Sequence, residues 1–151
     1  MIKTNSITIR APLQNIFSVA SDLPKWPEFL PHYRYNRFIS QMPWGGIVRM
    51  AANRSGIPTT WISIYRIDPE LRQLQFEHLN STMNATRGMK VVWSFEELQE
   101  GVKVEITHEL ELNWPIIGRF VADWIVGWFF IHHIASLTLA GLKKKMESAQ
   151  A

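Results

Sequence analysis

One histidine on an otherwise apolar strand face is the residue best placed to do chemistry in this sequence. The segment 102–112 alternates strictly, so one face of the expected strand carries His108 among aliphatic side chains. An imidazole titrates near neutral pH, and His108 can therefore act as a general acid or base on a ligand carbonyl. The alternative is a structural histidine bonded to Tyr65, Ser63 or the backbone. The residues on this inner face are Val102, Val104, Ile106, His108, Leu110 and Leu112.

Other groups for catalysis or metal binding are sparse. His132 and His133 are adjacent, so on a helix they point about 100° apart and do not chelate one metal ion. The sequence has no cysteine, which excludes a thiol nucleophile, a disulfide and a zinc–thiolate site. It contains neither a nucleophile elbow nor a nucleotide-binding glycine loop. We expect neither a metal nor a cofactor.

Arg54 is a cation whose position in an expected strand could bring it close to a bound ligand. It precedes an expected turn at Ser55-Gly56 and shares its strand parity with Met50 and Ala52. Arg54 either reaches the mouth of a pocket or lies at the rim, paired with a carboxylate.

The elements that position these residues are read from hydrophobic periodicity. A strand around Ile7 and Ile9 is followed by a short helix that begins at Pro12, and the prolines of 23–31 permit only a broken second helix. Six further alternating segments are separated by turn signals, which predicts a seven-stranded antiparallel meander. The segments are 32–41, 45–54, 57–68, 72–79, 89–98 and 102–112, with turns expected at Gly45-Gly46, Ser55-Gly56, Asp68-Pro69, Asn80-Ser81 and Glu100-Gly101.

A helical period follows from Ile116 to about Met146. One apolar stripe is expected to pack on the sheet, and it contains Ile117, Phe120, Val121, Trp124, Trp128, Ile131, Ala135, Leu139 and Leu142. A second apolar set on the opposite face is expected to meet a second subunit, a membrane surface or another protein, and it contains Val126, Phe129, Phe130, Ile134 and Leu137. Asp123 and the two histidines argue against a membrane span.

The predicted fold is a single α+β domain over residues 1–151, of the helix-grip type. A seven-stranded curved antiparallel sheet surrounds a long C-terminal helix, and two short helices follow the first strand. The sequence contains seven Trp and eight Phe, which favours a cavity for a flat apolar ligand. The residues expected to line it are Trp61, Ser63, Met89, Val91, Trp93, Phe95, Ile106, Trp124, Trp128, Ile131 and His132, with Arg54 at the mouth.

The charge distribution limits the kinds of binding partner that we expect. The 16 basic residues are spread along the chain, so we expect no nucleic-acid partner. The run Lys143 to Lys145 is interpreted as a solvated helix end, with acidic lipid headgroups as the alternative. Because cysteine is absent and the first ten residues alternate, we expect a cytoplasmic location.

Three segments carry a resemblance to a known family: WPEFLPHY (26–33), WISIYRIDP (61–69) and GMKVVW (88–93). Their order and spacing resemble the START-related superfamily that includes the birch-pollen-allergen proteins, and within it the polyketide cyclase/dehydrase and coenzyme Q-binding group. The resemblance implies that Tyr33 acts in cyclisation with an arginine. That arginine falls on Tyr65, and Arg66 beside it is expected to face away from the cavity.

Two functions follow as hypotheses. In the first, the protein cyclises or dehydrates a polyketide-like chain, with Tyr33, Tyr65 and His108 as donors or proton carriers. In the second, it is a non-catalytic carrier of a quinone, isoprenoid or aromatic lipid. A homodimer or a peripheral membrane contact through the outer face of the last helix is compatible with either.

Overall fold

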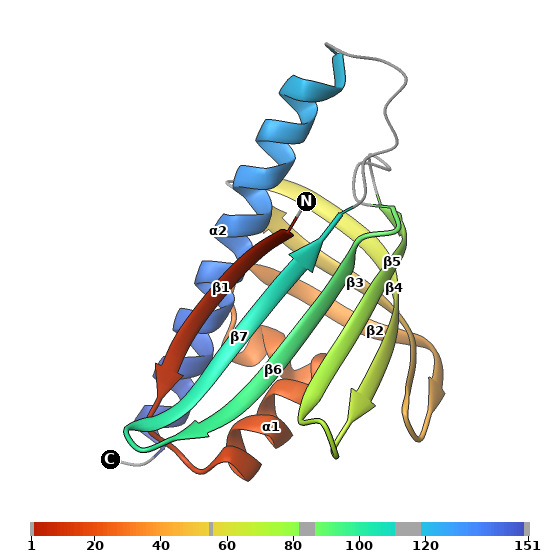
Figure 1. The fold of residues 1–151 in the computed structure, drawn as a ribbon. Helices are drawn as coiled ribbons and strands as arrows, with labels where there is room; N and C mark the ends of the chain where they lie inside the picture. The colour runs from red at the N-terminus through yellow and green to blue at the C-terminus, as the bar shows by residue number, and fades with distance from the viewer. Residues whose placement is uncertain (1, 55, 82–86, 111–118, 150–151) are drawn as a thin grey trace.

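The computed structural model describes residues 2–54, 56–81, 87–110 and 119–149, without the side chains of Arg54, Ser81 and residues 119–130. Two short helices follow the first strand, and a long helix ends the chain (Figure 1). The elements are β1 (Ile2–Ile9), α1 (Leu13–Ser21), the 3-10 helix η1 (Leu23–Glu28), β2 (Tyr33–Met42), β3 (Gly45–Arg54), β4 (Ile57–Asp68), β5 (Gln73–Ser81), β6 (Lys90–Leu98), β7 (Gly101–Glu109) and α2 (Arg119–Ser148).

The strands form one seven-stranded antiparallel sheet in the order β1-β7-β6-β5-β4-β3-β2. Only β1 is out of sequence order, because it pairs with β7 at the far edge. The sheet curves, and α2 crosses its concave side (Figure 1). This arrangement confirms the predicted α+β helix-grip fold.

The two short helices close one end of the concave side. Pro12 precedes the first turn of α1, where its missing N–H costs nothing. Pro27 lies inside η1 and limits it to a single short stretch, as the prolines predict. Trp26 of η1 is buried, and its Nε1 donates a 3.0 Å hydrogen bond to the carbonyl oxygen of Ala20 in α1. The indole therefore ties the two helices together beneath the sheet.

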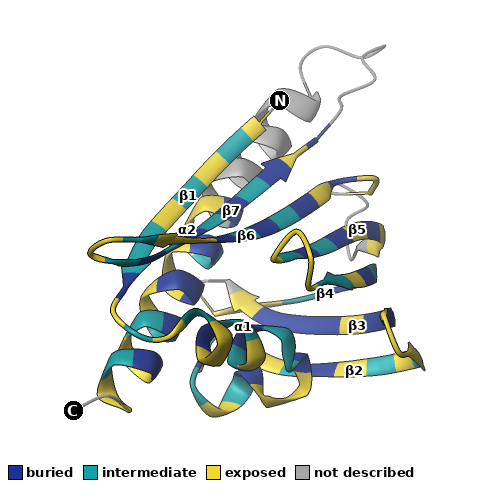
Figure 2. Ribbon diagram, turned by 60° about the horizontal axis from the view of Figure 1, so that its bottom comes forward, coloured by how far each residue is buried: buried dark blue, intermediate teal, exposed yellow. Residues whose placement is uncertain are grey.

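Helix α2 turns an apolar stripe toward the sheet. Ile131, Ala135, Leu139 and Leu142 are buried at helical spacing, as predicted (Figure 2). Of the opposite set, Leu137 is 39% exposed. Ile134, in contrast, packs on the core, so its assignment to the outer face was wrong. The remaining members of both sets that lie between residues 117 and 130 fall outside the described side chains.

Strand β5 is longer than its turn signal indicated. Asn80 and Ser81 were expected to form a turn, yet they pair with Ile62 and Trp61 of β4. An irregularity in register between Ile62 and Ser63 allows this extra pairing. The longer strand pairs β5 with β4 from Trp61 to Asp68. No helix within the described residues is long and apolar enough to cross a membrane.

Candidate functional site

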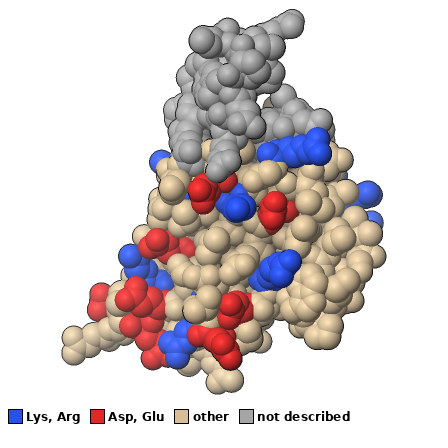
Figure 3. Space-filling view, turned by 45° about the vertical axis from the view of Figure 1, so that its right-hand side comes forward, with Lys and Arg blue, Asp and Glu red and all other residues tan. Residues whose placement is uncertain are grey.

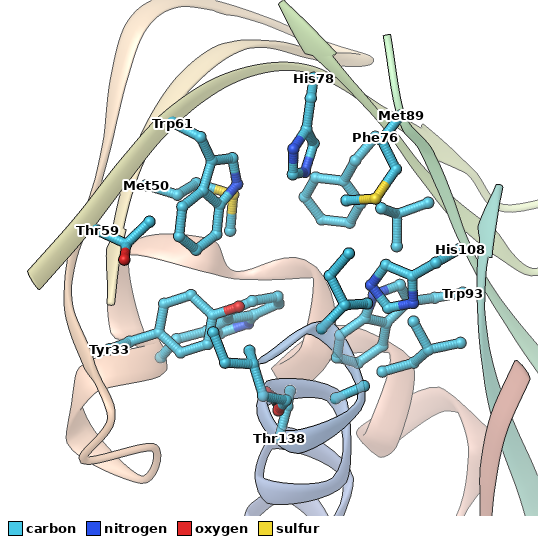
Figure 4. Close-up of a pocket in the computed structure, with 16 residues that line it drawn as sticks. Tyr33, Met50, Thr59, Trp61, Phe76, His78, Met89, Trp93, His108 and Thr138 are labelled. Atoms are coloured by element: carbon cyan, nitrogen blue, oxygen red, sulfur yellow. Dashed lines mark hydrogen bonds between the residues drawn. The ribbon is translucent and has the colours of Figure 1, made fainter. Parts of the chain in front are cut away.

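A pocket lies between the concave side of the sheet and α2 (Figure 4). Its cavity volume is about 70 Å³, and it is open to solvent on one side. Most of its wall is apolar or aromatic. The lining residues are Trp26, Tyr33, Met50, Thr59, Trp61, Phe76, His78, Met89, Val91, Trp93, Ile106, His108, Ile131, Ile134, Ala135 and Thr138.

His108 reaches the pocket from β7, where it pairs with Val91 of β6. The residue is only 9% exposed, and its Nδ1 is buried without a hydrogen-bond partner. Burial lowers the pKa of His108 to about 4, so the ring is neutral at pH 7. A buried acceptor without a partner is less costly than a buried N–H without one. We therefore assign the hydrogen to Nε2.

His78 is a second imidazole in the wall, and the sequence analysis missed it. It is buried, and its ring stacks on Trp61 with the centroids 5.8 Å apart. Its strand parity matches that of Leu74 and Phe76, both buried, and this alternation was the signal that could have found it. Because a turn was expected at Asn80-Ser81, the end of this strand was not assigned to the pocket.

Aromatic rings form the floor and one side of the pocket. Trp26 meets Tyr33 edge-on at 5.1 Å and lies 5.3 Å from Trp93, between ring centroids. Tyr33 also contacts Trp61 at 6.1 Å. Figure 4 shows the hydroxyl of Tyr33 directed toward the middle of the pocket. These rings make a rigid surface against which a flat ligand can stack.

Two residues that the sequence analysis assigned to the site lie elsewhere. Tyr65 is fully buried outside the pocket, and its hydroxyl donates a 2.9 Å hydrogen bond to the carbonyl oxygen of Ser21. Burial, and then the charge of Asp22, raises the pKa of Tyr65 well above its usual value. Tyr65 is therefore not available as a proton carrier, which corrects the prediction. Ser63 is also fully buried away from the pocket, and its Oγ has no hydrogen-bond partner.

Phe95 and His132 are also placed away from the pocket. Phe95 packs edge-on against Phe17 of α1, 5.2 Å between centroids, below the pocket floor. His132 is exposed, and its Nδ1 lies 2.9 Å from Nδ2 of Asn5 on β1. Both were expected to contact the ligand, and parity along a strand or helix did not reveal how far along the element the pocket extends. The side chains of Arg54, Trp124 and Trp128 lie outside the described residues.

The expected residues that do line the pocket come from β2, β4, β6, β7 and α2, and from Met89 just before β6. They are Tyr33, Trp61, Met89, Val91, Trp93, Ile106, His108 and Ile131. None of the described lining residues is an Asp, Glu, Lys or Arg, and the ring of His108 is neutral at pH 7. The described residues hold no cluster of three metal-binding side chains either. The arrangement therefore suits a neutral ligand with a few oxygen atoms.

A hydrogen-bonded pair reaches the pocket from the opposite side. Thr138 of α2 lines the pocket, and its hydroxyl donates a 2.7 Å bond to the carbonyl oxygen of Ile134. The Nε2 of His32 lies 2.9 Å from the same hydroxyl oxygen. Since the hydroxyl hydrogen goes to Ile134, Nε2 of His32 is the donor to Thr138. His32 precedes β2 and is half-buried.

Comparison with known proteins identifies the family. Residues 3–147 match the family described as polyketide cyclase / dehydrase and lipid transport. The chain belongs to this family. A relative from Streptomyces cyaneus, which carries the provisional name of polyketide cyclase, is 24% identical over 111 residues, or 72% of each chain.

Several proteins of known structure share this fold over nearly the full length of the chain. The Zhui aromatase/cyclase from Streptomyces sp. R1128 superimposes with a TM-score of 0.86 at 15% identity, over 100% of this chain and 96% of its own. A START superfamily protein from Mycobacterium smegmatis gives 0.73 at 14% identity, over 98% of both chains. The ginseng major latex-like protein 151 from Panax ginseng gives 0.75 at 10% identity, over 97% of both chains. At these identities the likeness establishes the fold.

In this member of the polyketide cyclase/dehydrase family, position 65 is occupied by Tyr65. The resemblance places an arginine there, and this chain holds a tyrosine whose hydroxyl is occupied by Ser21. On the face shown in Figure 3, basic and acidic side chains are interspersed and neither sign dominates.

Proposed function

We propose that the protein binds a neutral polyketide-like chain in the pocket and promotes its cyclisation with loss of water. The observation that carries the proposal is the neutral imidazole of His108, held on an apolar wall with its Nδ1 buried and unpartnered. With Nδ1 left as an acceptor, Nε2 carries the hydrogen and is the one donor that this ring can offer to a ligand. A ketone oxygen is the acceptor that a neutral N–H would select.

The donor would act where charge develops. When an enol carbon attacks a ketone, negative charge grows on that ketone oxygen, and a preorganised N–H of His108 stabilises it. A donor of this kind typically contributes about 10²- to 10³-fold in rate. The hydroxyl of Tyr33, directed toward the middle of the pocket, is a second donor for the same chain (Figure 4). The surrounding rings exclude water and strengthen both hydrogen bonds.

The size of the cavity sets a condition on binding. Its volume of about 70 Å³ is smaller than the roughly 150 Å³ of a cavity known to hold benzene. A chain long enough to cyclise enters only if the wall yields. Met50 and Met89 both line the pocket, and unbranched thioether side chains adapt readily to a guest. We expect these two side chains to move on binding.

The proposal is tested with a synthetic poly-β-ketone thioester whose spontaneous products are a mixture of ring patterns. The native protein is expected to favour one pattern, and His108→Phe to return the mixture toward the spontaneous one. The matched control is His132→Phe, since His132 is exposed on α2 outside the pocket. Product analysis by liquid chromatography and mass spectrometry reads the result. A native-protein mixture identical to the protein-free one would overturn the proposal.

A carrier is the second candidate, and one observation favours it. No lysine or arginine lines the described part of the pocket, so a full enolate charge has no permanent counter-ion there. A carrier of a quinone, isoprenoid or aromatic lipid needs none. Two results together would favour the carrier. One is tight retention of 2-naphthol in native mass spectrometry, and the other is a set of poly-β-ketone products that does not differ from the protein-free mixture.

A further inference from the structure

We propose that Thr138 and His32 form a proton relay through the pocket wall, which delivers a proton from solvent to the departing oxygen of the bound chain. This inference rests on the proposed function and assigns residues to its dehydration step. Neither residue belongs to the group of donors on the sheet. Thr138 lies on α2, across the pocket from His108 (Figure 4).

The geometry of the pair supports transfer of a proton. The oxygen of Thr138 sits between two partners, 2.7 Å from the carbonyl oxygen of Ile134 and 2.9 Å from Nε2 of His32. Thr138 is only 2% exposed, whereas His32 is half-buried. The pair therefore spans the wall between the pocket and the outside. Only a rotation about the C–O bond is needed to redirect the hydroxyl hydrogen from Ile134 to a ligand oxygen.

The surroundings hold His32 in place. Its ring packs on that of Tyr33 with centroids 4.8 Å apart, and its carbonyl oxygen accepts a 2.8 Å bond from the backbone N–H of Asn53. Burial, and then the positive charge of a protonated His133, lowers the pKa of His32 to about 4. A ring that stays neutral at pH 7 passes a proton on without retaining it.

The step balances in atoms and charge. The hydroxyl of Thr138 protonates the hydroxyl on the ring carbon, the C–O bond breaks, and one molecule of water leaves. Thr138 regains its hydrogen from Nε2 of His32, and Nδ1 of His32 takes a proton from solvent water. Proton exchange with solvent then returns His32 to its starting tautomer, with the hydrogen on Nε2. The proton on the neighbouring carbon returns to solvent as the carbon–carbon double bond forms. One water is released for each double bond, with no oxidant or reductant.

The test compares four proteins: native, Thr138→Val, Thr138→Ser and His32→Gln. Valine keeps the shape of threonine without the hydroxyl, serine keeps the hydroxyl, and glutamine keeps an N–H donor without a second ring nitrogen. Water loss from the poly-β-ketone thioester is followed in H2O and D2O, and 2-naphthol binding is measured by calorimetry. General acid catalysis predicts a loss of about 10²-fold or more in Thr138→Val and His32→Gln. We expect Thr138→Ser to restore the rate, and we expect naphthol affinity to be unchanged in His32→Gln, because His32 does not line the pocket.

The outcomes separate this inference from the proposed function. A native rate of water loss equal to the protein-free rate would overturn both. Native acceleration that disappears in His108→Phe but persists in Thr138→Val would overturn the relay alone. A slow Thr138→Ser protein would overturn it as well, because a restored hydroxyl must restore transfer. A D2O effect present in the native protein and reduced in His32→Gln would support it, since a purely structural role for His32 leaves that effect unchanged.

Discussion

The hydroxyl of Tyr65 on β4 donates a 2.9 Å hydrogen bond to the carbonyl oxygen of Ser21, the last residue of α1. That carbonyl has no partner within the helix, so the tyrosine satisfies a group that the helix end leaves open. The ring of Tyr65 stacks on Phe76 of β5 with centroids 4.8 Å apart. One side chain thus fastens the short helices to the sheet beneath the pocket.

Tyr65→Phe removes this hydrogen bond and keeps the ring. We expect the free energy of unfolding to fall by about 1 to 2 kcal/mol, because the carbonyl oxygen of Ser21 loses its partner. The ligand-binding properties should not change, since Tyr65 does not line the pocket. Urea unfolding and 2-naphthol titration check the two expectations. Tyr35→Phe is the control, and a large loss of affinity in Tyr65→Phe would contradict this role.

Ser63→Ala is expected to raise stability. The Oγ of Ser63 is buried and has no hydrogen-bond partner, so its desolvation is not offset. Alanine lacks this hydroxyl, so the substitution should raise the free energy of unfolding by about 1 kcal/mol. The matched control is Ser94→Ala on the outer face of β6, which is expected to stay within about 0.5 kcal/mol. A lower urea midpoint in Ser63→Ala would show that this hydroxyl has a stabilising partner after all.

The fold was predictable because each element carries a clear local signal. Strand β7 alternates from Val102 to His108 without a break, and each inner residue is buried as expected. Pro12 and Pro27 marked the short helices. Asn80 misled, because a residue typical of turns also tolerates the end of a paired strand once a bulge accommodates it. Local signals do not carry the register that decides such cases.

The site was predictable only in part, because alternation along a strand does not show how far along that strand the pocket extends. Alternation told which face His108, Met89 and Trp93 occupy, and all three line the pocket. It did not tell that Tyr65, on the same face, lies beyond the pocket floor. The pair of His32 and Thr138 joins residues 106 positions apart. Such a contact depends on how α2 crosses the sheet, which no periodicity in one segment records.

Ala135→Leu should close the pocket. Ala135 lines the cavity from α2 and is buried, so a leucine side chain there occupies much of the roughly 70 Å³ that is open. We expect 2-naphthol affinity to fall by tenfold or more, with the unfolding free energy reduced by no more than about 1 to 3 kcal/mol by overpacking. Ala140→Leu, exposed on the same helix, is the control. Unaltered affinity in Ala135→Leu would place the binding site elsewhere.

The stability of the protein should depend on pH through His108. Burial lowers the pKa of this histidine from 6.5 to about 4 in the folded protein. As the pH falls below about 6.5 the unfolded chain takes up a proton at His108 while the folded protein does not. The free energy of unfolding therefore decreases between pH 6.5 and pH 4, and this group adds no pH dependence above that range.

The decrease attributable to His108 is on the order of 3 kcal/mol, since each unit of pKa corresponds to about 1.4 kcal/mol. His32 shifts in the same direction and titrates in the same range, so the native protein alone does not isolate the effect. The difference between native protein and His108→Phe does, because His32 is present in both. Urea unfolding at pH 7 and at pH 4.5 should show a clearly smaller decrease in His108→Phe, and His132→Phe, changed at an exposed site, should behave as native. Equal decreases in native protein and His108→Phe would mean that folding does not lower the pKa of His108, which would contradict burial of its ring in an apolar wall.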